Sequence, residues 1–382
     1  MTGVVVLGST GSIGRQALEV VSAHPDRFSV VGLASASRAS DLLQQAADWP
    51  EARVWLADGR PDDLPEGRWA AGGLEELATQ SGADIVLVAT TGMAALPAVL
   101  AALAAGRRVA LANKETLVTG GHLVAAALDD AGGDPLERLR PVDSEHSAIW
   151  QCLLGERIED VRRLVLTASG GPFRDTPPAE LDSVTPEEAL AHPTWRMGPK
   201  ITIDSATLVN KAFEAIEARW LYRLPYSRID AVIHPRSVVH SLVEFTDGSY
   251  KAQLGVPDMR LPIQYALSYP ARLPSPARQA PPQEWGALEF SELDQQRFPA
   301  YAIVRAAAEA GGNRGTILNA ADEVAVAAFL AGSLPFSGIA GTIGQAVDRW
   351  GTDAEPSLAG IQALDAEVRA ELSARFGMVG AA

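Results

Sequence analysis

Hydrophobic residues in the first 142 positions occur in short apolar runs, which are separated by Ala- and Leu-rich stretches with helical spacing. Four runs are expected to be buried strands: Val4–Leu7, Val30–Leu33, Ile85–Ala89 and Val109–Ala112. Buried strands that alternate with helices are typical of a doubly wound parallel sheet. The pattern therefore predicts an α/β fold that begins with a Rossmann-like domain over residues 1–142.

After residue 142 the pattern mixes helices with strands. We expect a helix after Ser144, strands near 164–167 and 201–203, and a second helix through 206–221. Farther on, the sequence EFTDGSYKAQ places an Asp-Gly turn between two alternating runs, which is a strong hairpin signal. These features predict an α+β catalytic or connective domain over residues 143–268.

The last part of the chain begins with a proline-rich stretch, SYPARLPSPARQAPPQEW, which is typical of a semi-rigid linker. An Ala-rich pattern with helical spacing then continues from about residue 296 to the end. We therefore expect a linker over 269–295 and a C-terminal helical domain over 296–382.

A glycine-rich turn follows the first predicted strand in the sequence VVVLGSTGSIGRQALEVV. Gly8, Gly11 and Gly14 are spaced three apart, and a helix is expected to begin within this turn. Such glycines let the backbone approach a pyrophosphate, whose charge is stabilised by the N-terminus of the helix. The strand, turn and helix together predict a dinucleotide-binding site, with a purely structural turn as the alternative.

The end of the second strand indicates which dinucleotide is bound. An NAD enzyme usually has an acidic residue there, which binds the ribose 2′-hydroxyl. This chain has Ser37 and Arg38 in the sequence VVGLASASRAS, and no acidic residue. A hydroxyl and a guanidinium suit a 2′-phosphate, so NADPH is favoured over NADH. An arginine exposed on the surface would give the same pattern.

Two carboxylates lie two residues apart in the sequence PVDSEHSAIW. In an extended segment Asp143 and Glu145 would point to the same side and could share one ion. Close carboxylates become favourable around a hard divalent cation, since Mg²⁺ and Mn²⁺ prefer oxygen ligands. A solvated acidic loop is the alternative, and a third ligand would exclude it.

The sequence ITIDSATLVNKAFEAIEARW offers that third ligand. A strand is expected to end at Ile203, with Asp204 or Ser205 as N-cap of the next helix. In that helix Asn210 and Lys211 share a face with Glu214, at spacings of four and three residues. The alternative is a solvent-exposed polar stripe, and because Glu217 lies on the same stripe, helical spacing cannot choose between the two glutamates.

Charge and composition exclude several classes of function. The formal net charge is −15, which disfavours nucleic acid and anionic membranes as partners. The apolar stretch over 84–112 is interrupted by glycine and proline, so no membrane span is expected. Cys152 is the single cysteine, which excludes an internal disulfide. With no targeting segment evident, we expect a cytoplasmic protein.

Seven motifs occur along the chain in a recognisable order: GSTGSIG, LANKE, PVDSEH, SGGPF, HPTWRMGPK, DSATLVNKAFE and LNAADE. Together they resemble the 1-deoxy-D-xylulose 5-phosphate reductoisomerase family over essentially the whole chain. The resemblance implies conversion of 1-deoxy-D-xylulose 5-phosphate to 2-C-methyl-D-erythritol 4-phosphate in non-mevalonate isoprenoid biosynthesis. In this family the carbon skeleton rearranges first, and hydride then reduces the resulting branched aldehyde. NADPH and Mg²⁺, Mn²⁺ or Co²⁺ are the implied cofactors.

The resemblance also implies roles for individual residues. The implied metal ligands, which are also catalytic, are Asp143, Glu145 and Glu214, so that Glu217 is not a ligand. The implied phosphate pocket contains Ser169, Ser205, Asn210 and Lys211, with His192 close by. The implied contacts to the reacting part of the substrate are Lys114, which is catalytic, and Ser144. The implied NADPH contacts are Thr10, Gly11, Ser12, Ile13, Asn113, Glu115 and Gly198.

The same resemblance identifies HPTWRMGPK as a mobile lid, in which Trp195 would cover the substrate or pack against its own domain. Lys200 ends this motif without an assigned role. Related enzymes are homodimers, and the hairpin-rich segment near 229–255 is the expected interface.

Two other classes of function remain as alternatives. One is another NADP-dependent dehydrogenase, such as an acylating semialdehyde dehydrogenase, which would need a catalytic cysteine. Cys152 lies in the apolar run AIWQCLLG and is better explained as a core residue. The other is a non-catalytic dinucleotide sensor, which would have no use for clustered carboxylates and a phosphate pocket.

Overall fold

The computed structural model describes residues 1–378, which divide into two compact units. The first unit comprises Met1–Thr116, Leu123–Trp150 and Asp258–Gln279, and the second comprises Leu117–His122, Gln151–Pro257 and the chain from Ala280 onward. The division into three domains and a linker stays a prediction. Among the described residues, no helix is both long and apolar enough to cross a membrane.

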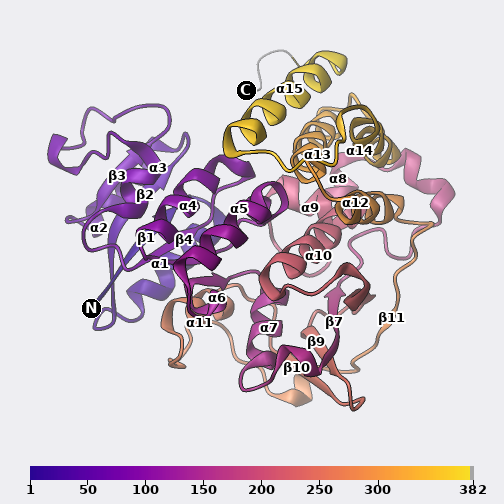
Figure 1. Ribbon diagram of the computed structural model, residues 1–382, viewed down its shortest axis with the longest axis horizontal. Coiled ribbons are helices and arrows are strands. Elements are labelled where there is room, and N and C mark those ends of the chain that lie inside the picture. The colour runs from indigo at the N-terminus through magenta and orange to yellow at the C-terminus, as the bar shows by residue number, and fades with distance from the viewer. Residues whose placement is uncertain (379–382) are drawn as a thin grey trace. The chain divides into compact units, whose positions relative to one another are not determined.

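A six-stranded parallel sheet forms the centre of the first unit (Figure 1), with the strand order β3-β2-β1-β4-β5-β6. Its strands are β1 (Thr2–Leu7), β2 (Phe28–Ser35), β3 (Arg53–Leu56), β4 (Ile85–Val88), β5 (Arg108–Leu111) and β6 (Leu139–Pro141). The predicted doubly wound, Rossmann-like fold is therefore confirmed. The strand order reverses between β1 and β4, and at such a point ligands bind beyond the carboxyl ends of the strands.

Helices of the first unit surround this sheet, and all but α11 lie between its strands in the chain. They are α1 (Ser12–Ser22), α2 (Ala39–Asp48), α3 (Gly73–Thr79), α4 (Leu96–Ala104), α5 (Glu115–Ala131), α6 (Pro135–Arg138) and α11 (Arg260–Ser268), with 3₁₀ turns η1 (Glu66–Arg68) and η2 (Gly92–Ala95). Residues 117–122 of α5 belong to the second unit. Although α11 is far away in sequence, it packs on α1, and Arg140 Nη1 donates to the Ala266 carbonyl oxygen at 2.8 Å.

The second unit contains a mixed five-stranded sheet with the order β10-β9-β7-β8-β11. Its strands are β7 (Val161–Ala168), β8 (Ile229–Ile233), β9 (Val239–Phe245), β10 (Tyr250–Leu254) and β11 (Ser291–Glu292). The predicted hairpin is confirmed, since β9 and β10 are antiparallel and joined through Asp247 and Gly248. Gly248 has a φ of +85°, which a glycine adopts without strain.

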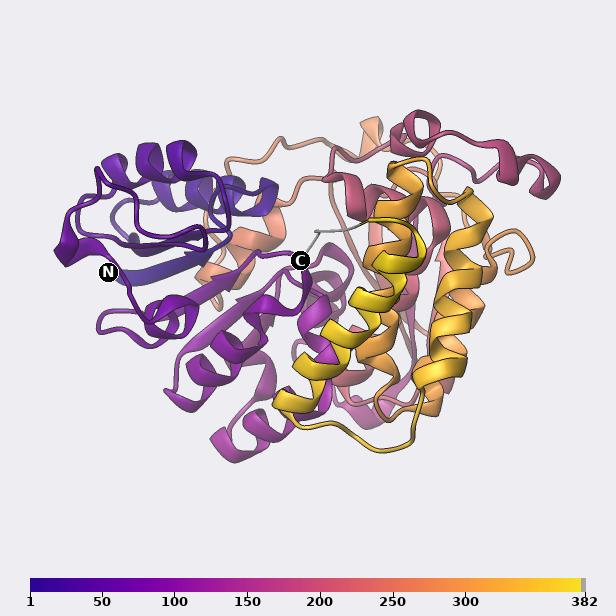
Figure 2. The same ribbon diagram turned by 90° about the horizontal axis from the view of Figure 1, so that it is seen from above.

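The helical part of the second unit agrees with the Ala-rich pattern. Its helices are α8 (Pro186–Leu190), α9 (Pro199–Thr207), α10 (Val209–Tyr222), α12 (Pro299–Ala310), α13 (Arg314–Leu330), α14 (Phe336–Trp350) and α15 (Leu358–Arg375). Helix α7 (Ser144–Leu153) starts in the first unit and ends here, and the 3₁₀ turns are η3 (Ile158–Asp160), η4 (Pro178–Ser183), η5 (Tyr226–Arg228) and η6 (Pro282–Glu284). Helices α13, α14 and α15, orange to yellow in Figure 2, lie side by side.

The strand predicted near 201–203 is wrong, because these residues lie within α9. Gly198 caps this helix, and Pro199 occupies its first turn, where its fixed φ favours a helical start. In this helix Thr202 and Ile203 are buried and Ile201 is half-buried. Leu208, in the left-handed conformation, then separates α9 from α10, so neither Asp204 nor Ser205 caps α10.

Candidate active site

The turn between β1 and α1 allows close approach of a phosphate. Gly8 has a φ of +84°, and a Cβ there would lie 2.5 Å from the Ala89 carbonyl oxygen. A Cβ on Gly14 would lie 2.3 Å from the Gly8 carbonyl oxygen, so glycine is needed for α1 to pack on the turn. Gly11 caps α1 without a side chain, and the first amide groups of the helix therefore face outward for an anion.

Residues predicted to contact the cofactor lie around this turn. Thr10 precedes α1, and its hydroxyl is 2.7 Å from that of Ser35 at the end of β2. Ser12 and Ile13 form the first turn of α1. The turn is thus joined to the carboxyl end of β2, as a dinucleotide site at the switch point requires.

Two guanidinium groups flank Asp41 just beyond β2. Arg38, which was predicted from the sequence, follows Ser37 at the start of α2 and is 54% exposed, with Nη1 3.9 Å from Asp41. Arg15 was not predicted; its Nε donates to the Thr10 carbonyl oxygen at 2.9 Å, and its Nη2 lies 2.7 Å from Asp41. Its position directly after the last glycine of the turn was the available signal.

Asn113 connects the loops that follow β4 and β5. Its Nδ2 donates to the carbonyl oxygens of Thr90 and Gly92 at 2.9 and 2.8 Å, and to Glu115 Oε2 at 3.0 Å. Its Oδ1 accepts from the Thr116 amide at 2.9 Å. The side chain of Asn113 is therefore occupied with shaping the carboxyl edge of the sheet, next to Lys114.

A buried ion pair joins Lys114 to Asp143. Lys114 Nζ lies 2.9 Å from Asp143 Oδ2, and the side chains are only 7% and 10% exposed. Burial alone would raise the pKa of Asp143, but the Lys114 ammonium opposes it and holds that pKa well below its usual range. The ammonium therefore favours the carboxylate form of Asp143, which is the form that binds a metal ion.

Asp143 and Glu145 come together through the start of a helix. The Asp143 carbonyl oxygen accepts from the Ser147 amide at 2.8 Å, and Glu145 lies in the first turn of α7. The assumption of an extended segment was therefore wrong, because the helix begins directly after Asp143. Even so, a carboxylate oxygen of each residue lies within 4.8 Å of the other. Ser144 Oγ hydrogen-bonds to Glu145 Oε2.

Helix α10 buries its polar face. Lys211 and Glu214 are 3% and 1% exposed, so the alternative of a solvent-exposed polar stripe is excluded. Asn210 Nδ2 donates to Glu214 Oε1 at 2.6 Å, and the Lys211 ammonium pairs with Glu214 Oε2. Glu217 is also buried, at 2%, so burial does not choose between the two glutamates.

His192 links two serines from different elements of the second unit. Its Nε2 lies 3.1 Å from the hydroxyls of Ser169, which follows β7, and of Ser205 in α9. Its Nδ1 accepts from the Thr194 and Trp195 amides at 3.1 and 2.9 Å. Since Nδ1 accepts, the neutral ring carries its proton on Nε2 and donates toward the serines. Burial lowers the pKa of His192, which also favours the neutral ring.

This arrangement leaves the hydroxyl proton of Ser169 for a ligand. The Ser169 Oγ accepts from His192 and, at 3.2 Å, from the Gly171 amide. With both of these donors directed at the oxygen, its own O–H must donate elsewhere. A hydroxyl whose oxygen already accepts two hydrogen bonds can still donate one, and a phosphate oxygen is a suitable acceptor.

The predicted lid, 192–200, runs without regular structure from His192 to Gly198 and ends in the first turn of α9. Trp195 is half-buried, and its ring centroid lies 6.5 Å from that of His240. In this conformation Trp195 therefore rests against its own unit, which is the packing alternative considered from the sequence.

Cys152 lies in α7 and is 6% exposed. Burial raises the pKa of its thiol to about 11, so the thiolate needed for nucleophilic attack is scarce at neutral pH. The cysteine is a core residue, and the acylating-dehydrogenase alternative lacks its nucleophile.

Three family models match the chain. The model of 1-deoxy-D-xylulose 5-phosphate reductoisomerase matches residues 4–121, and that of its C-terminal domain matches 139–222. A second model, of the DXP reductoisomerase C-terminal domain, matches residues 254–371. Among curated relatives, the reductoisomerase of Thermomicrobium roseum is 51% identical over 93% of this chain and 92% of its own length. That of Geobacillus kaustophilus is 48% identical over 96% of this chain and 97% of its own length.

Solved structures agree over the full length. The reductoisomerase of Zymomonas mobilis in complex with NADPH has a TM-score of 0.89 at 40% identity, and covers 98% of this chain and 99% of its own. A DOX-P reductoisomerase in complex with NADPH, fosmidomycin and magnesium has a TM-score of 0.90 at 36% identity and covers 100% of both chains. Sequence and fold agree along the whole length, and this chain belongs to the 1-deoxy-D-xylulose 5-phosphate reductoisomerase family.

Proposed function

We propose that this chain converts 1-deoxy-D-xylulose 5-phosphate to 2-C-methyl-D-erythritol 4-phosphate, with NADPH as hydride donor and a divalent metal ion, in isoprenoid biosynthesis. The observation that carries the proposal is the full-length match to a solved relative in complex with NADPH, fosmidomycin and magnesium. The reaction is an intramolecular rearrangement followed by reduction of the resulting aldehyde.

We assign the ion, Mg²⁺, Mn²⁺ or Co²⁺, to Asp143, Glu145 and Glu214. These are oxygen donors of the kind that hard divalent cations prefer, and Asp143 and Glu214 are buried. When bound, the ion polarises substrate oxygens and stabilises negative charge that develops on them. Lys114 and Lys211 each pair with one of the buried ligands within its own unit. At Asp143 this pairing lowers the pKa and so favours the ionised carboxylate before an ion binds.

The phosphate group of the substrate is assigned to Ser169, Ser205, Asn210 and Lys211. His192 Nε2 lies 3.1 Å from both serine hydroxyls, and the Ser169 proton is available to an acceptor. Lys211 supplies the positive charge that an anion requires in a chain with a net charge of −15. Lys211 also pairs with Glu214. A phosphate that binds Lys211 and an ion that binds Glu214 would each draw on this pair, so the two proposed sites are coupled.

Lys114 and Ser144 are assigned to the reacting part of the substrate, next to the ligands that they contact in the first unit. NADPH is assigned to the β1–α1 turn, with its 2′-phosphate near Ser37 and Arg38. The remaining cofactor contacts are proposed at Thr10, Gly11, Ser12, Ile13, Asn113, Glu115 and Gly198.

A homodimer in the cytoplasm is part of the proposal. Strand β10 is an end strand of its sheet, and Tyr250 on it is 50% exposed. An exposed edge strand is a ready site for pairing with a second copy. The segment 229–255, which contains β10, is therefore the proposed interface. Light scattering of the wild type and of a Tyr250→Lys variant would test this assignment.

The catalytic proposal is tested by following NADPH absorbance after adding 1-deoxy-D-xylulose 5-phosphate, with and without a chelator. The expected result is substrate-dependent oxidation that stops with the chelator and returns with excess Mg²⁺ or Mn²⁺. A non-catalytic dinucleotide sensor would bind NADPH and oxidise none of it.

A further inference from the structure

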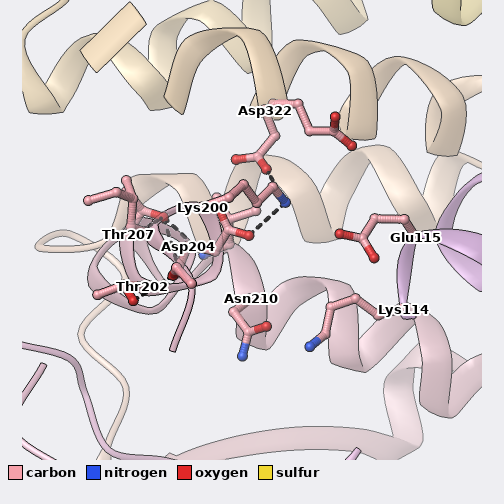
Figure 3. A network of polar contacts seen from close by, with 12 residues as sticks. Lys114, Glu115, Lys200, Thr202, Asp204, Thr207, Asn210 and Asp322 are labelled. Atoms are coloured by element: carbon pink, nitrogen blue, oxygen red, sulfur yellow. Dashed lines mark hydrogen bonds and ion pairs between the residues drawn. The ribbon is translucent and has the colours of Figure 1, made fainter. Parts of the chain in front are cut away.

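Lys200 lies where the lid ends and α9 begins, and it faces two buried carboxylates. Its Nζ is 2.6 Å from Asp204 Oδ2 and 2.7 Å from Asp322 Oδ2. Figure 3 shows the ammonium between the two carboxylates. Asp204 lies one turn farther along α9 and is 1% exposed, whereas Asp322 comes from α13 and is fully buried. The ammonium therefore joins α9 to the C-terminal helices.

A third contact extends this connection to α10. Lys200 Nζ lies 5.2 Å from the ring centroid of Phe213, within the range of a cation–π interaction. Phe213 is fully buried and precedes Glu214 directly. One side chain thus contacts the helix that carries Ser205 and the helix that carries Lys211 and Glu214.

Two carboxylates face Lys200, although one would be enough to neutralise its ammonium. Asp204, at i+4 on the same helix, would be enough to pair the ammonium. Asp322 adds a second buried carboxylate, which is costly, and burial raises its pKa although the Lys200 ammonium opposes the shift. What Asp322 adds is a connection between α9 and α13.

We propose that Lys200 and Asp322 are positioning residues for the substrate-phosphate site. Through Asp204, the neighbour of Ser205, the link to α13 fixes α9 so that Ser205 meets His192 at 3.1 Å. Through Phe213 it fixes the start of α10. Neither residue touches the substrate. The inference rests on the proposed function, because it takes the Ser169–His192–Ser205 cluster to be the phosphate pocket.

Two variants of Asp322 separate positioning from charge. Asp322→Asn and Asp322→Leu both remove one carboxylate and leave the Lys200–Asp204 pair balanced, so both are expected to fold. Asn keeps an acceptor for the ammonium, whereas Leu removes the link to α13. Lys200→Met is the more severe change, since it leaves two buried carboxylates without their cation.

A matched control exists in the same helical region. Arg369 is 26% exposed against 25% for Lys200, and it also faces two carboxylates, Glu323 on α13 and Asp365. Arg369→Met should lower the melting temperature without changing substrate binding. Its partner Glu323 directly follows Asp322 on α13, so this variant disturbs the same part of α13 but leaves the Lys200–Asp322 contact in place.

The experiment measures the KM for 1-deoxy-D-xylulose 5-phosphate, kcat, the inhibition constant of inorganic phosphate and the melting temperature. For Asp322→Leu and Lys200→Met we expect KM and the phosphate inhibition constant to rise about tenfold or more, since small misplacements of binding groups have effects of this size. Asp322→Asn should stay close to wild type, and Arg369→Met should change only the melting temperature.

The inference is overturned if Asp322→Leu folds and keeps the KM and phosphate inhibition of Asp322→Asn. It is also overturned if Arg369→Met raises KM as much as Lys200→Met does, because general destabilisation would then explain the effect. Failure of the proposed function would give a different result. The wild type itself would then show no substrate-dependent oxidation of NADPH, and inorganic phosphate would have no reaction to inhibit.

Discussion

Replacing Lys211 with glutamine tests the phosphate pocket most sharply. Lys211 is 3% exposed and is the cation that α10 provides to the proposed pocket. Losing a hydrogen bond from a charged group costs about 1.5–3 kcal/mol. Since 1.36 kcal/mol corresponds to a factor of ten, the KM for 1-deoxy-D-xylulose 5-phosphate should rise by about 10- to 150-fold.

The same substitution also leaves Glu214 without its ammonium. Both side chains of this pair are under 5% exposed, so little solvent screening is available. Breaking such a buried pair by removing one partner costs about 3–5 kcal/mol of unfolding free energy. A lower melting temperature is therefore expected together with the change in KM, and the assay must separate the two effects.

Three measurements do so: KM for the substrate, competition by inorganic phosphate, and NADPH affinity of the free enzyme, each on protein shown to be folded. Binding of NADPH should be nearly unchanged, because Lys211 is not among the proposed cofactor contacts. Arg349→Gln is the control, since Arg349 pairs with Glu371, is 59% exposed on α14 and lies outside both the proposed pocket and the proposed interface. If Lys211→Gln lowers the melting temperature but leaves KM and phosphate competition unchanged, Lys211 is only a partner of Glu214.

Other predictions concern the cofactor, the thiol and pH. Arg38→Ala should weaken NADPH binding by about 1.5–3 kcal/mol and NADH binding far less, and equal losses in titrations would show that Arg38 does not contact the 2′-phosphate. Cys152→Ser should leave kcat largely intact in the NADPH assay, whereas total loss would restore a catalytic cysteine. Since burial lowers the pKa of His192, the unfolded chain binds its proton first, and stability should fall as pH drops below the ordinary value of 6.5. His192→Gln should reduce the pH dependence of the melting temperature. If that dependence is the same in the variant and the wild type, His192 does not cause it.

The Rossmann-like unit could be predicted because local patterns specify it. Buried parallel strands are continuously apolar, and the close approach of Gly14 to Gly8 is local in sequence, although Gly8 itself approaches the distant Ala89. The Asp-Gly hairpin is specified locally in the same way. By contrast, nothing in the sequence near Arg260–Ser268 shows that α11 packs on α1, since that contact joins residues more than 200 positions apart.

Errors at the site have physical causes. The β-branched run at 201–203 favours a strand by propensity, but Gly198, Pro199 and burial against other helices favour α9. Helical spacing placed Asn210, Lys211 and Glu214 on one face of α10 without showing whether that face is buried. The contact of Arg15 with Asp41 was missed because Asp41 lies beyond the next strand. The positioning contact between Lys200 and Asp322 joins residues 122 positions apart, and neither belongs to a pattern in the sequence that connects them.

The central claim, that Glu214 and not Glu217 completes a divalent-metal site with Asp143 and Glu145, is tested most directly by Mn²⁺ binding. The loss of the free Mn²⁺ signal in electron paramagnetic resonance would be measured for the wild type, Glu214→Gln and Glu217→Gln, without substrate. We expect one ion per chain in the wild type and in Glu217→Gln. Affinity should be at least about tenfold weaker in Glu214→Gln, because a charged oxygen ligand is lost. Full affinity in Glu214→Gln, together with loss of binding in Glu217→Gln, would contradict the assignment.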